Sequence, residues 1–209
     1  MIGTVDGNHS PNQLAKRSLI IDAAVETMKR DGVVGCTVRA IASSASVTKG
    51  TVHYYFADVR EVVNAAFQRL TDDYVTAVEN VTGDIEHPAA AFWTLVAAYL
   101  EPFEAHPSMA RLWFDYTAWA TRHGFQRELA GAMASISGMF ERRLVAVGAR
   151  KADRGRSVER YLLGTILDLS ASKISFDDVF ADVARLCELK PPRPGEVIVD
   201  HDLVCPLCS

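Results

Sequence analysis

The stretch Thr37–Phe56 gathers side chains that could bind nucleic acid. Thr48 can cap a helix that opens at Lys49, because its hydroxyl can accept from an unpaired backbone N–H. At helical spacing Val52 then faces inward and the polar residues face outward. Hydroxyls and a lysine donate to phosphates and base edges, and a threonine methyl can touch a thymine methyl. The outward set is Thr48, Lys49, Thr51, His53 and Tyr54.

A second short helix comes directly before this one. Thr37 can cap it, and Ile41 and Ala42 fall on one face at helical spacing. The residues 45–47 form the turn between the two helices. This pattern predicts a helix-turn-helix whose second helix reads the major groove. Thr37, Arg39 and Tyr55 are predicted as supporting contacts.

The segment resembles the DNA-binding domain of the tetracycline-repressor (TetR) family. The shared pattern is Thr37, Ile41-Ala42, Ala45-Ser46-Val47-Thr48 and Lys49-Gly50-Thr51-Val52-His53-Tyr54-Tyr55-Phe56. Three positions depart from it: Ser46 replaces the usual turn glycine, His53 the usual tyrosine, and Val59 a common phosphate-binding lysine, with Arg60 beside it. The resemblance implies an all-α fold of about nine helices, with a three-helix DNA-binding domain and a helical body.

Charge is distributed unevenly along the 209 residues. Residues 1–60 hold seven Lys or Arg and five Asp or Glu, whereas residues 61–209 hold fifteen and twenty-one. A mildly basic head on an acidic body is typical of a small DNA-contacting module joined to a domain with another task. The net charge of −4 argues against non-specific coating of nucleic acid.

Helical periodicity predicts the remaining elements and three parts of the chain. We expect a DNA-binding domain at 1–57, with 1–10 as an inert arm, a body at 58–190 and a tail at 191–209. Glycine and proline punctuation predicts a connecting helix that Asp58 caps. Residues 148–155, GARKADRG, are predicted to form a basic loop, and the stretch Arg150–Arg156 is predicted to be solvated. The predicted helices span 12–30, 58–81, 89–105, 107–120, 125–147, 158–172 and 176–189.

The aromatic-rich segment 92–140 is the predicted ligand pocket, because pockets are mostly apolar with a few polar groups that fix orientation. Plain core packing is the alternative for each single residue, and the family resemblance supplies the weight for a pocket. Asp115, Arg111 or His123 could serve as polar anchors. The predicted lining comprises Trp93, Trp113, Phe114, Tyr116, Trp119, Phe125, Met133 and Met139.

Excess apolar residues on the last two helices, within residues 157–189, predict a homodimer interface. In the resembled family these helices usually form a four-helix interface. The two DNA-reading helices of a dimer, one from each chain, would match a palindromic operator.

Four cysteines are too few and too unevenly spread for a disulfide framework. His201, Cys205 and Cys208 have plausible metal-ligand spacing, with Cys187 as a fourth candidate. A redox-sensitive thiol pair and an inert tail are the other interpretations. A metal- or thiol-sensing regulator is therefore the alternative function, and no cofactor is expected otherwise.

The sequence lacks the common nucleophile, phosphate-loop and zinc-protease motifs. We therefore predict that the chain is not an enzyme, although a helical enzyme or carrier with a vestigial DNA module remains a second class. The absence of a signal pattern at 1–13, and of a long apolar run, predicts a cytoplasmic protein. The favoured function is a ligand-responsive DNA-binding regulator, most simply a repressor released by a small, largely apolar or aromatic molecule.

Overall fold

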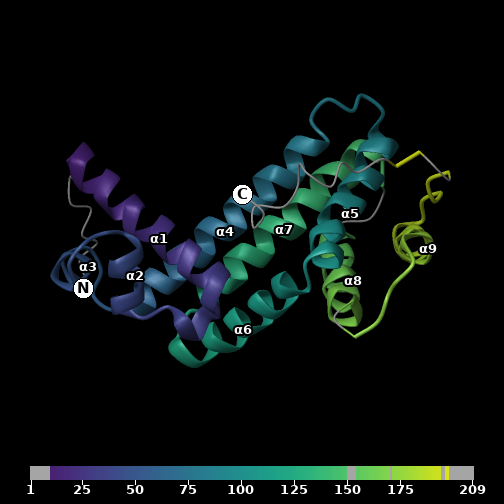
Figure 1. Cartoon of the computed structure of the whole chain (residues 1–209). Coiled ribbons are helices and arrows are strands. Elements are labelled where there is room, and N and C mark those ends of the chain that lie inside the picture. Colours follow the sequence, from purple (N-terminus) through teal and green to yellow (C-terminus); the bar gives the residue numbers. More distant parts are fainter. Residues whose placement is uncertain (1–9, 150–153, 170, 194–195, 198–209) are drawn as a thin grey trace. The chain divides into compact units, whose positions relative to one another are not determined.

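The computed structural model describes residues 10–149, 154–169, 171–193 and 196–197. Its described residues form nine α-helices and no strand, as expected (Figure 1). The chain divides into two compact units, Met1–Arg69 and Leu70–Ser209, and the boundary falls inside one helix. The predicted end of the DNA-binding domain at residue 57 stays a prediction. Within the described ranges, no helix combines the length and apolar character that crossing a bilayer requires.

The first unit contains α1 (Pro11–Gly35), α2 (Val38–Ser44), α3 (Lys49–Tyr55) and the start of α4 (Val59–Val81). Ser10 and Gln13 form a capping box at the start of α1. Gly32, at φ 73° and ψ 179°, interrupts α1 near its predicted end. This conformation is open to glycine, so the chain leaves the regular helix here and adds one short turn to Gly35. The predicted cap of α4 is confirmed, because the Asp58 carboxylate accepts from the Glu61 backbone N–H at 3.1 Å.

The core of the first unit is made by apolar residues at helical spacing, as the sequence predicts. Their side chains come from all four helices and have at most 2% of their surface exposed. These residues are Ile20, Ala24, Met28, Ile41, Val52, Phe56, Val62, Val63 and Ala66.

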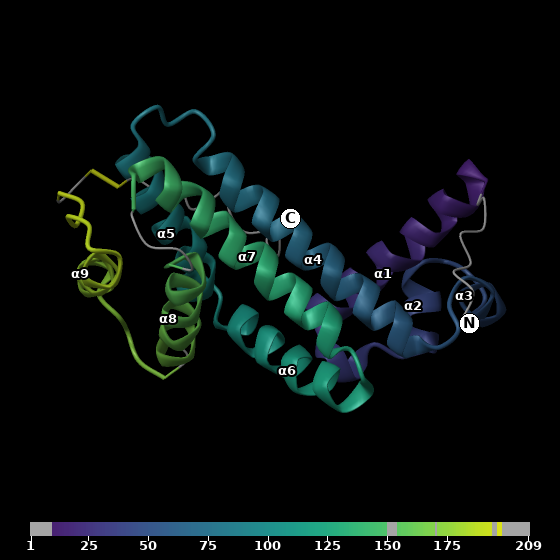
Figure 2. The ribbon, with the colours of Figure 1, turned by 180° about the vertical axis from the view of Figure 1, so that it is seen from behind.

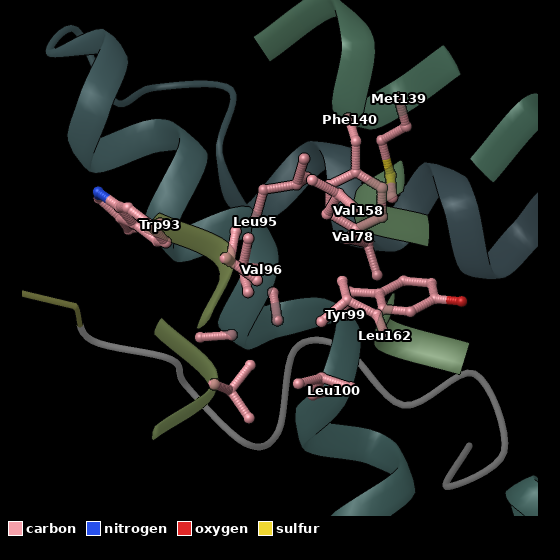
Figure 3. Packing of buried hydrophobic residues seen from close by; sticks show 14 of the residues in the cluster. Val78, Trp93, Leu95, Val96, Tyr99, Leu100, Met139, Phe140, Val158 and Leu162 are labelled. Carbon is pink, nitrogen blue, oxygen red and sulfur yellow. The ribbon is translucent and has the colours of Figure 1, made fainter. Parts of the chain in front are cut away.

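The second unit holds the rest of α4 and five further helices. They are α5 (Pro88–Ala105), α6 (Pro107–His123), α7 (Gln126–Val147), α8 (Arg154–Leu169) and α9 (Phe176–Cys187). Helix α7 packs against α8 and α5, and α9 packs against α8 (Figure 2). Helix α5 is buried along most of its length and forms the centre of the unit. Figure 3 shows its Val96, Tyr99 and Leu100 among side chains of α4, α7 and α8.

The start of α8 corrects one prediction. Arg154 and Gly155, placed in a solvated loop by their basic neighbours, are helical and buried. The guanidinium of Arg154 donates to the backbone carbonyl of Cys187 and pairs with Glu188 at 2.9 Å. Gly155 donates its N–H to Glu141 at 2.6 Å. Because these partners lie on α7 and at the end of α9, the burial depends on packing that the local sequence does not show.

Candidate nucleic-acid interface and ligand groove

The turn between α2 and α3 fixes the angle of the outward-facing helix. Ser46 has φ 51°, and the Val47 N–H donates to the Ala42 carbonyl at 2.9 Å, which is the hydrogen bond of a Schellman motif. Glycine is the usual residue in this left-handed position because a side chain there costs energy. Ser46 therefore occupies, with some strain, the position where the family pattern has glycine.

Both predicted caps are present at this turn. The Thr37 hydroxyl accepts from the Ala40 N–H at 3.2 Å, and the Thr48 hydroxyl accepts from the Thr51 N–H at 3.1 Å. The hydroxyls of Thr48 and Thr51 also lie 2.9 Å apart and share a hydrogen bond. These contacts hold the hydroxyls at the surface of α3 in fixed positions.

The predicted DNA-contacting side chains belong to the accessible surface of the α2–α3 pair, which we call the α2–α3 face. Apolar Ile41 and Val52 face inward with at most 1% of their surface exposed. Tyr54 is 70% exposed, and its hydroxyl accepts from the Gln13 side chain at 3.3 Å. Thr37, Arg39, Thr48, Lys49, His53 and Tyr54 are exposed or partly exposed, and Thr51 and Tyr55 are half-buried.

The cations of the first unit differ in whether they form a salt bridge with an acidic residue. Lys29, Arg30, Arg60 and Arg69 each form a salt bridge. Asp58 holds Arg60, and that guanidinium lowers the pKa of the carboxyl, mainly through the side-chain hydrogen bond. Among the ion pairs of the described residues, none includes Arg39 or Lys49. These two cations are therefore available to an anionic partner.

Gly50 lies on the same face of α3. A Cβ at this position would meet only the Thr48 hydroxyl, at 3.6 Å, which is an ordinary contact. The fold therefore does not require a glycine here, although glycine destabilises an exposed helix interior.

The predicted ligand-binding side chains lie in three places. Trp93 belongs to the core of the second unit, with its ring 5.7 Å from that of Phe180. Met133 lines an open groove between α7 and α8. Met139 lies in the core, and Trp113 and Phe114 pack against it. The others belong to an aromatic stack at the turn from α6 to α7.

In that stack, Trp119 lies parallel to Phe125 at 5.5 Å and to His123 at 4.6 Å, and its other neighbour is the buried Tyr116. His123, one of the three predicted polar anchors, has its Nδ1 atom 2.7 Å from the Trp119 carbonyl oxygen. The other two predicted anchors, Arg111 and Asp115, are exposed. Whether any of these side chains binds a ligand stays a prediction.

The α7–α8 groove has a volume of ≈ 240 Å³. Sequence reasoning missed all of its lining except Met133. The side chains come from two helices that are separated by the loop after Val147, so no local pattern marks them. The lining is Ala130, Met133, Ala134, Ser137, Arg156, Glu159 and Arg160.

The cysteines of the described residues are buried thiols. Burial raises the pKa of Cys36 to about 12 and that of Cys187 to about 11. Such thiols are poor nucleophiles and poor metal ligands at neutral pH. Within the described ranges, no cluster of three His, Cys, Asp or Glu could hold a metal ion. The candidates His201, Cys205 and Cys208 lie outside the described residues, so the sensing alternative stays a prediction.

Comparison with known proteins covers most of the chain. Residues 20–66, which contain α2 and α3, match the family "Bacterial regulatory proteins, tetR family". The nicotine-responsive transcriptional repressor HdnoR of Paenarthrobacter nicotinovorans is 26% identical over 71% of this chain and 78% of its own length. Such relatives are transcriptional regulators and not enzymes.

Solved structures share the fold of the chain. A transcriptional regulator, SCO7518 from Streptomyces coelicolor A3(2), has a TM-score of 0.68 at 18% identity, covering 82% of this chain and 98% of its own. The multidrug binding protein EbrR, complexed with imidazole, has a TM-score of 0.63 at 20% identity, covering 85% and 97%. The helix-turn-helix segment thus matches the tetR family, and the chain is similar in sequence and in its all-helical fold to transcriptional regulators.

Proposed function

We propose that the chain is a repressor that binds a palindromic operator as a homodimer and leaves it when a small molecule binds the body. The observation that carries the DNA-binding part is the polar face of α2 and α3. Its apolar residues are buried, its hydroxyls are fixed by caps, and Arg39 and Lys49 have no acidic partner among the described residues. Phosphates and base edges are the natural partners of such a face.

Within this face we assign different roles to different side chains. Lys49 and Arg39 bind phosphates and set the register of the protein on the duplex. Tyr54 and His53, which project from α3, contact bases or the backbone beside them. Thr37, Thr48, Thr51 and Tyr55 complete the interface with hydroxyl donors.

The relatives support a small-molecule effector for the body. HdnoR is described as nicotine-responsive and as a repressor, and EbrR as a multidrug binding protein. By extension, we propose an apolar or aromatic effector for this chain, with Trp93, Trp113, Phe114, Tyr116, Trp119, Phe125 and Met133 as the predicted lining.

Release would follow from a shift between two populations of the protein. Helix α4 contains the boundary between the two units, so a change in its orientation links them through one continuous element. In one conformation the two α3 helices of a dimer do not match successive major grooves. An effector that binds this conformation better lowers operator affinity, at most by the ratio of its affinities for the two conformations.

Fluorescence anisotropy on DNA from upstream of the chain's own gene tests the DNA-binding part. We expect saturable binding that survives unrelated competitor DNA at several salt concentrations, because affinity without a stated salt concentration is uninterpretable. Lys49→Ala should weaken binding by roughly tenfold and lower the salt slope by about one.

The matched control is Lys173→Ala, which removes an exposed lysine from the second unit. Equal affinity of the Lys49→Ala variant and the wild-type protein for the operator would refute the assignment. Equal loss in both lysine variants would indicate non-specific attraction.

The homodimer is supported by apolar side chains left at the surface of α8 and α9. Leu167 is 56% exposed and Leu186 is 39% exposed, although both belong to otherwise amphipathic helices. We propose that residues 157–189 cover this surface in a second copy. Sedimentation equilibrium should give a dimer, and Leu167→Asp with Leu186→Asp should shift it toward monomer. Val145→Asp, at a 66% exposed position on α7, is the control.

A further inference from the structure

One buried carboxylate in the second unit lacks a complete set of partners. Glu159 on α8 is 3% exposed, and its Oε1 has no hydrogen-bond partner among the described residues. Burial raises the pKa of this carboxyl, against the opposing effect of Arg160 and Arg156. Buried polar atoms in folded proteins are nearly always paired, because an unpaired one loses its hydration without compensation.

This carboxylate lines the α7–α8 groove. Glu159 contributes to the lining of this groove of ≈ 240 Å³, although its Oε1 atom has no exposed surface. A volume of this size accommodates a ligand of about eight non-hydrogen atoms, since a water molecule takes about 30 Å³. Because Oε1 itself is covered, a small ligand in the groove supplies the missing partner only when the Glu159 side chain turns toward it.

The other walls of the groove restrict the chemistry of that ligand. On the α7 side, Ala130, Met133 and Ala134 offer a short apolar surface. On the α8 side, Arg156 and Arg160 flank the acid and are exposed, so they stand nearer to solvent than it does. A cation alone would meet two like charges, and an anion alone would meet the carboxylate.

We propose that the α7–α8 groove binds a small zwitterion, whose ammonium group donates to Glu159 and whose anionic group pairs with Arg156 or Arg160. Its apolar part packs on Met133 and the two alanines. Arg160 falls within the segment proposed to meet a second copy, so in a dimer Arg156, which lies outside that segment, is the cation left open to the ligand. As the effector site, the groove rests on the proposed function.

The three charges should not contribute equally. Glu159 is buried, so its bond to an ammonium group acts in a low dielectric and is poorly screened. The arginines are exposed, and ion pairs with exposed partners are weak. The donor end of the ligand should therefore matter more than the anionic end.

Calorimetric titration of the full chain with three probes that share one branched apolar chain tests the site. Leucine carries both charges, isoamylamine lacks the carboxylate, and 4-methylpentanoate lacks the ammonium group. We expect leucine to bind most tightly, isoamylamine roughly threefold more weakly and 4-methylpentanoate at least tenfold more weakly, in line with exposed and buried charge pairs.

Variants then assign the binding to this groove. Glu159→Gln keeps the shape and removes the charge, and should weaken leucine binding by roughly tenfold or more. Ala134→Phe fills the groove without changing a charge and should abolish binding, which keeps the test valid if Glu159→Gln folds poorly. Glu104→Gln, at an exposed site on α5, is the control and should bind as the wild-type protein does.

Three results would overturn the zwitterion site: no heat with leucine at millimolar concentration, equal affinity for all three probes, or unchanged leucine binding in Ala134→Phe. Operator binding measured in parallel separates this proposal from the proposed function. If leucine binds without releasing DNA, the binding site is supported but its role as the effector site is refuted. A protein that binds leucine but no operator would refute the repressor and not the groove.

Discussion

The α2–α3 face and the α7–α8 groove differ in how they present charged groups: the cations of the face are exposed, and the carboxylate of the groove is buried. On the face, Lys49 and Arg39 have no acidic partner among the described residues, and the neighbouring hydroxyls are held by their own helices. In the groove, Glu159 is covered, and one of its oxygens has no partner in the described part of the chain. A surface that meets a large polyanion can keep its groups hydrated until contact, whereas a small ligand needs a group that is already desolvated.

The largest effect should come from a substitution that disrupts the packing of α8 against α7, on which the groove depends. A Cβ on Gly155 would lie 2.4 Å from the Ser137 carbonyl oxygen and 2.7 Å from the Glu141 backbone nitrogen, and a backbone cannot yield as a flexible side chain can. Gly155→Ala should lower the free energy of unfolding by about 3 kcal/mol, at the upper end for overpacking. Urea denaturation measures this change.

Gly131→Ala is the matched control, because a Cβ there meets nothing within 4 Å and the position lies inside α7. Replacing an exposed helical glycine by alanine should stabilise by about 0.5–1 kcal/mol. Equal effects of the two substitutions would show that α8 does not depend on its close approach to α7.

The next effect should appear on the DNA-binding face. Gly50→Ala should raise the melting temperature, since the new Cβ meets only an ordinary contact at 3.6 Å. If the proposed docking brings the DNA backbone against α3 at Gly50, the same methyl should lower operator affinity by roughly tenfold, a change of about 1.4 kcal/mol. Anisotropy and thermal melting are read on the same sample. A stabilised variant with unchanged affinity would place the DNA away from this face.

A smaller effect concerns the turn that orients α3. Ser46→Gly should stabilise the protein by about 1 kcal/mol, because it removes the cost of a side chain at φ 51°. Operator affinity should change little, since the turn keeps its geometry. Chemical denaturation gives the stability, and Ser44→Gly, inside α2, should be destabilising as the opposite control.

The smallest effect should be the pH dependence that Glu159 adds. Burial raises its pKa above the ordinary 4.5, so the folded state binds this proton more tightly than the unfolded state does. The charged carboxylate therefore costs stability above the folded pKa, and the cost disappears as the pH falls through 4.5. Tyr99, Arg156 and Arg160 are the ionisable groups with an electrostatic effect on it.

Glu159→Gln should accordingly be more stable than the wild-type protein at pH 7, and the difference should shrink toward pH 4. Denaturation curves at both pH values measure this convergence. A difference that stays constant with pH would mean that the pKa of Glu159 is the same in the folded and unfolded states, contrary to the raised value.

The α2–α3 segment was predictable because its defining contacts join residues that are close in sequence. The caps at Thr37 and Thr48, the turn at Ser46 and the inward Val52 depend on neighbours within a few residues, so spacing alone indicated them. The apolar stripes of α4 to α9 were predictable for the same reason. The start of α8 was not, because Arg154 is buried by the carbonyl of Cys187, far along the chain.

The α7–α8 groove required the structure for a similar reason. Glu159 adjoins Arg160 in sequence and resembles part of a solvated face, yet it lies beside the apolar stripe of Val158, Leu162 and Ile166 and is buried with it. A carboxylate next to an apolar stripe is the signal that could have found it. The depth of the groove and the approach of Met133 depend on how α7 and α8 pack, which periodicity does not determine.

The contact between Arg154 and the end of α9 has a consequence for the connection between α8 and α9. Arg154 holds the last turn of α9 at its carbonyl end, while Val183 and Cys187 anchor the same helix in the core. The covalent link between the two helices is then redundant for their association. A tryptic nick after the exposed Lys173 should leave both fragments together on a native column and separate them only in denaturant.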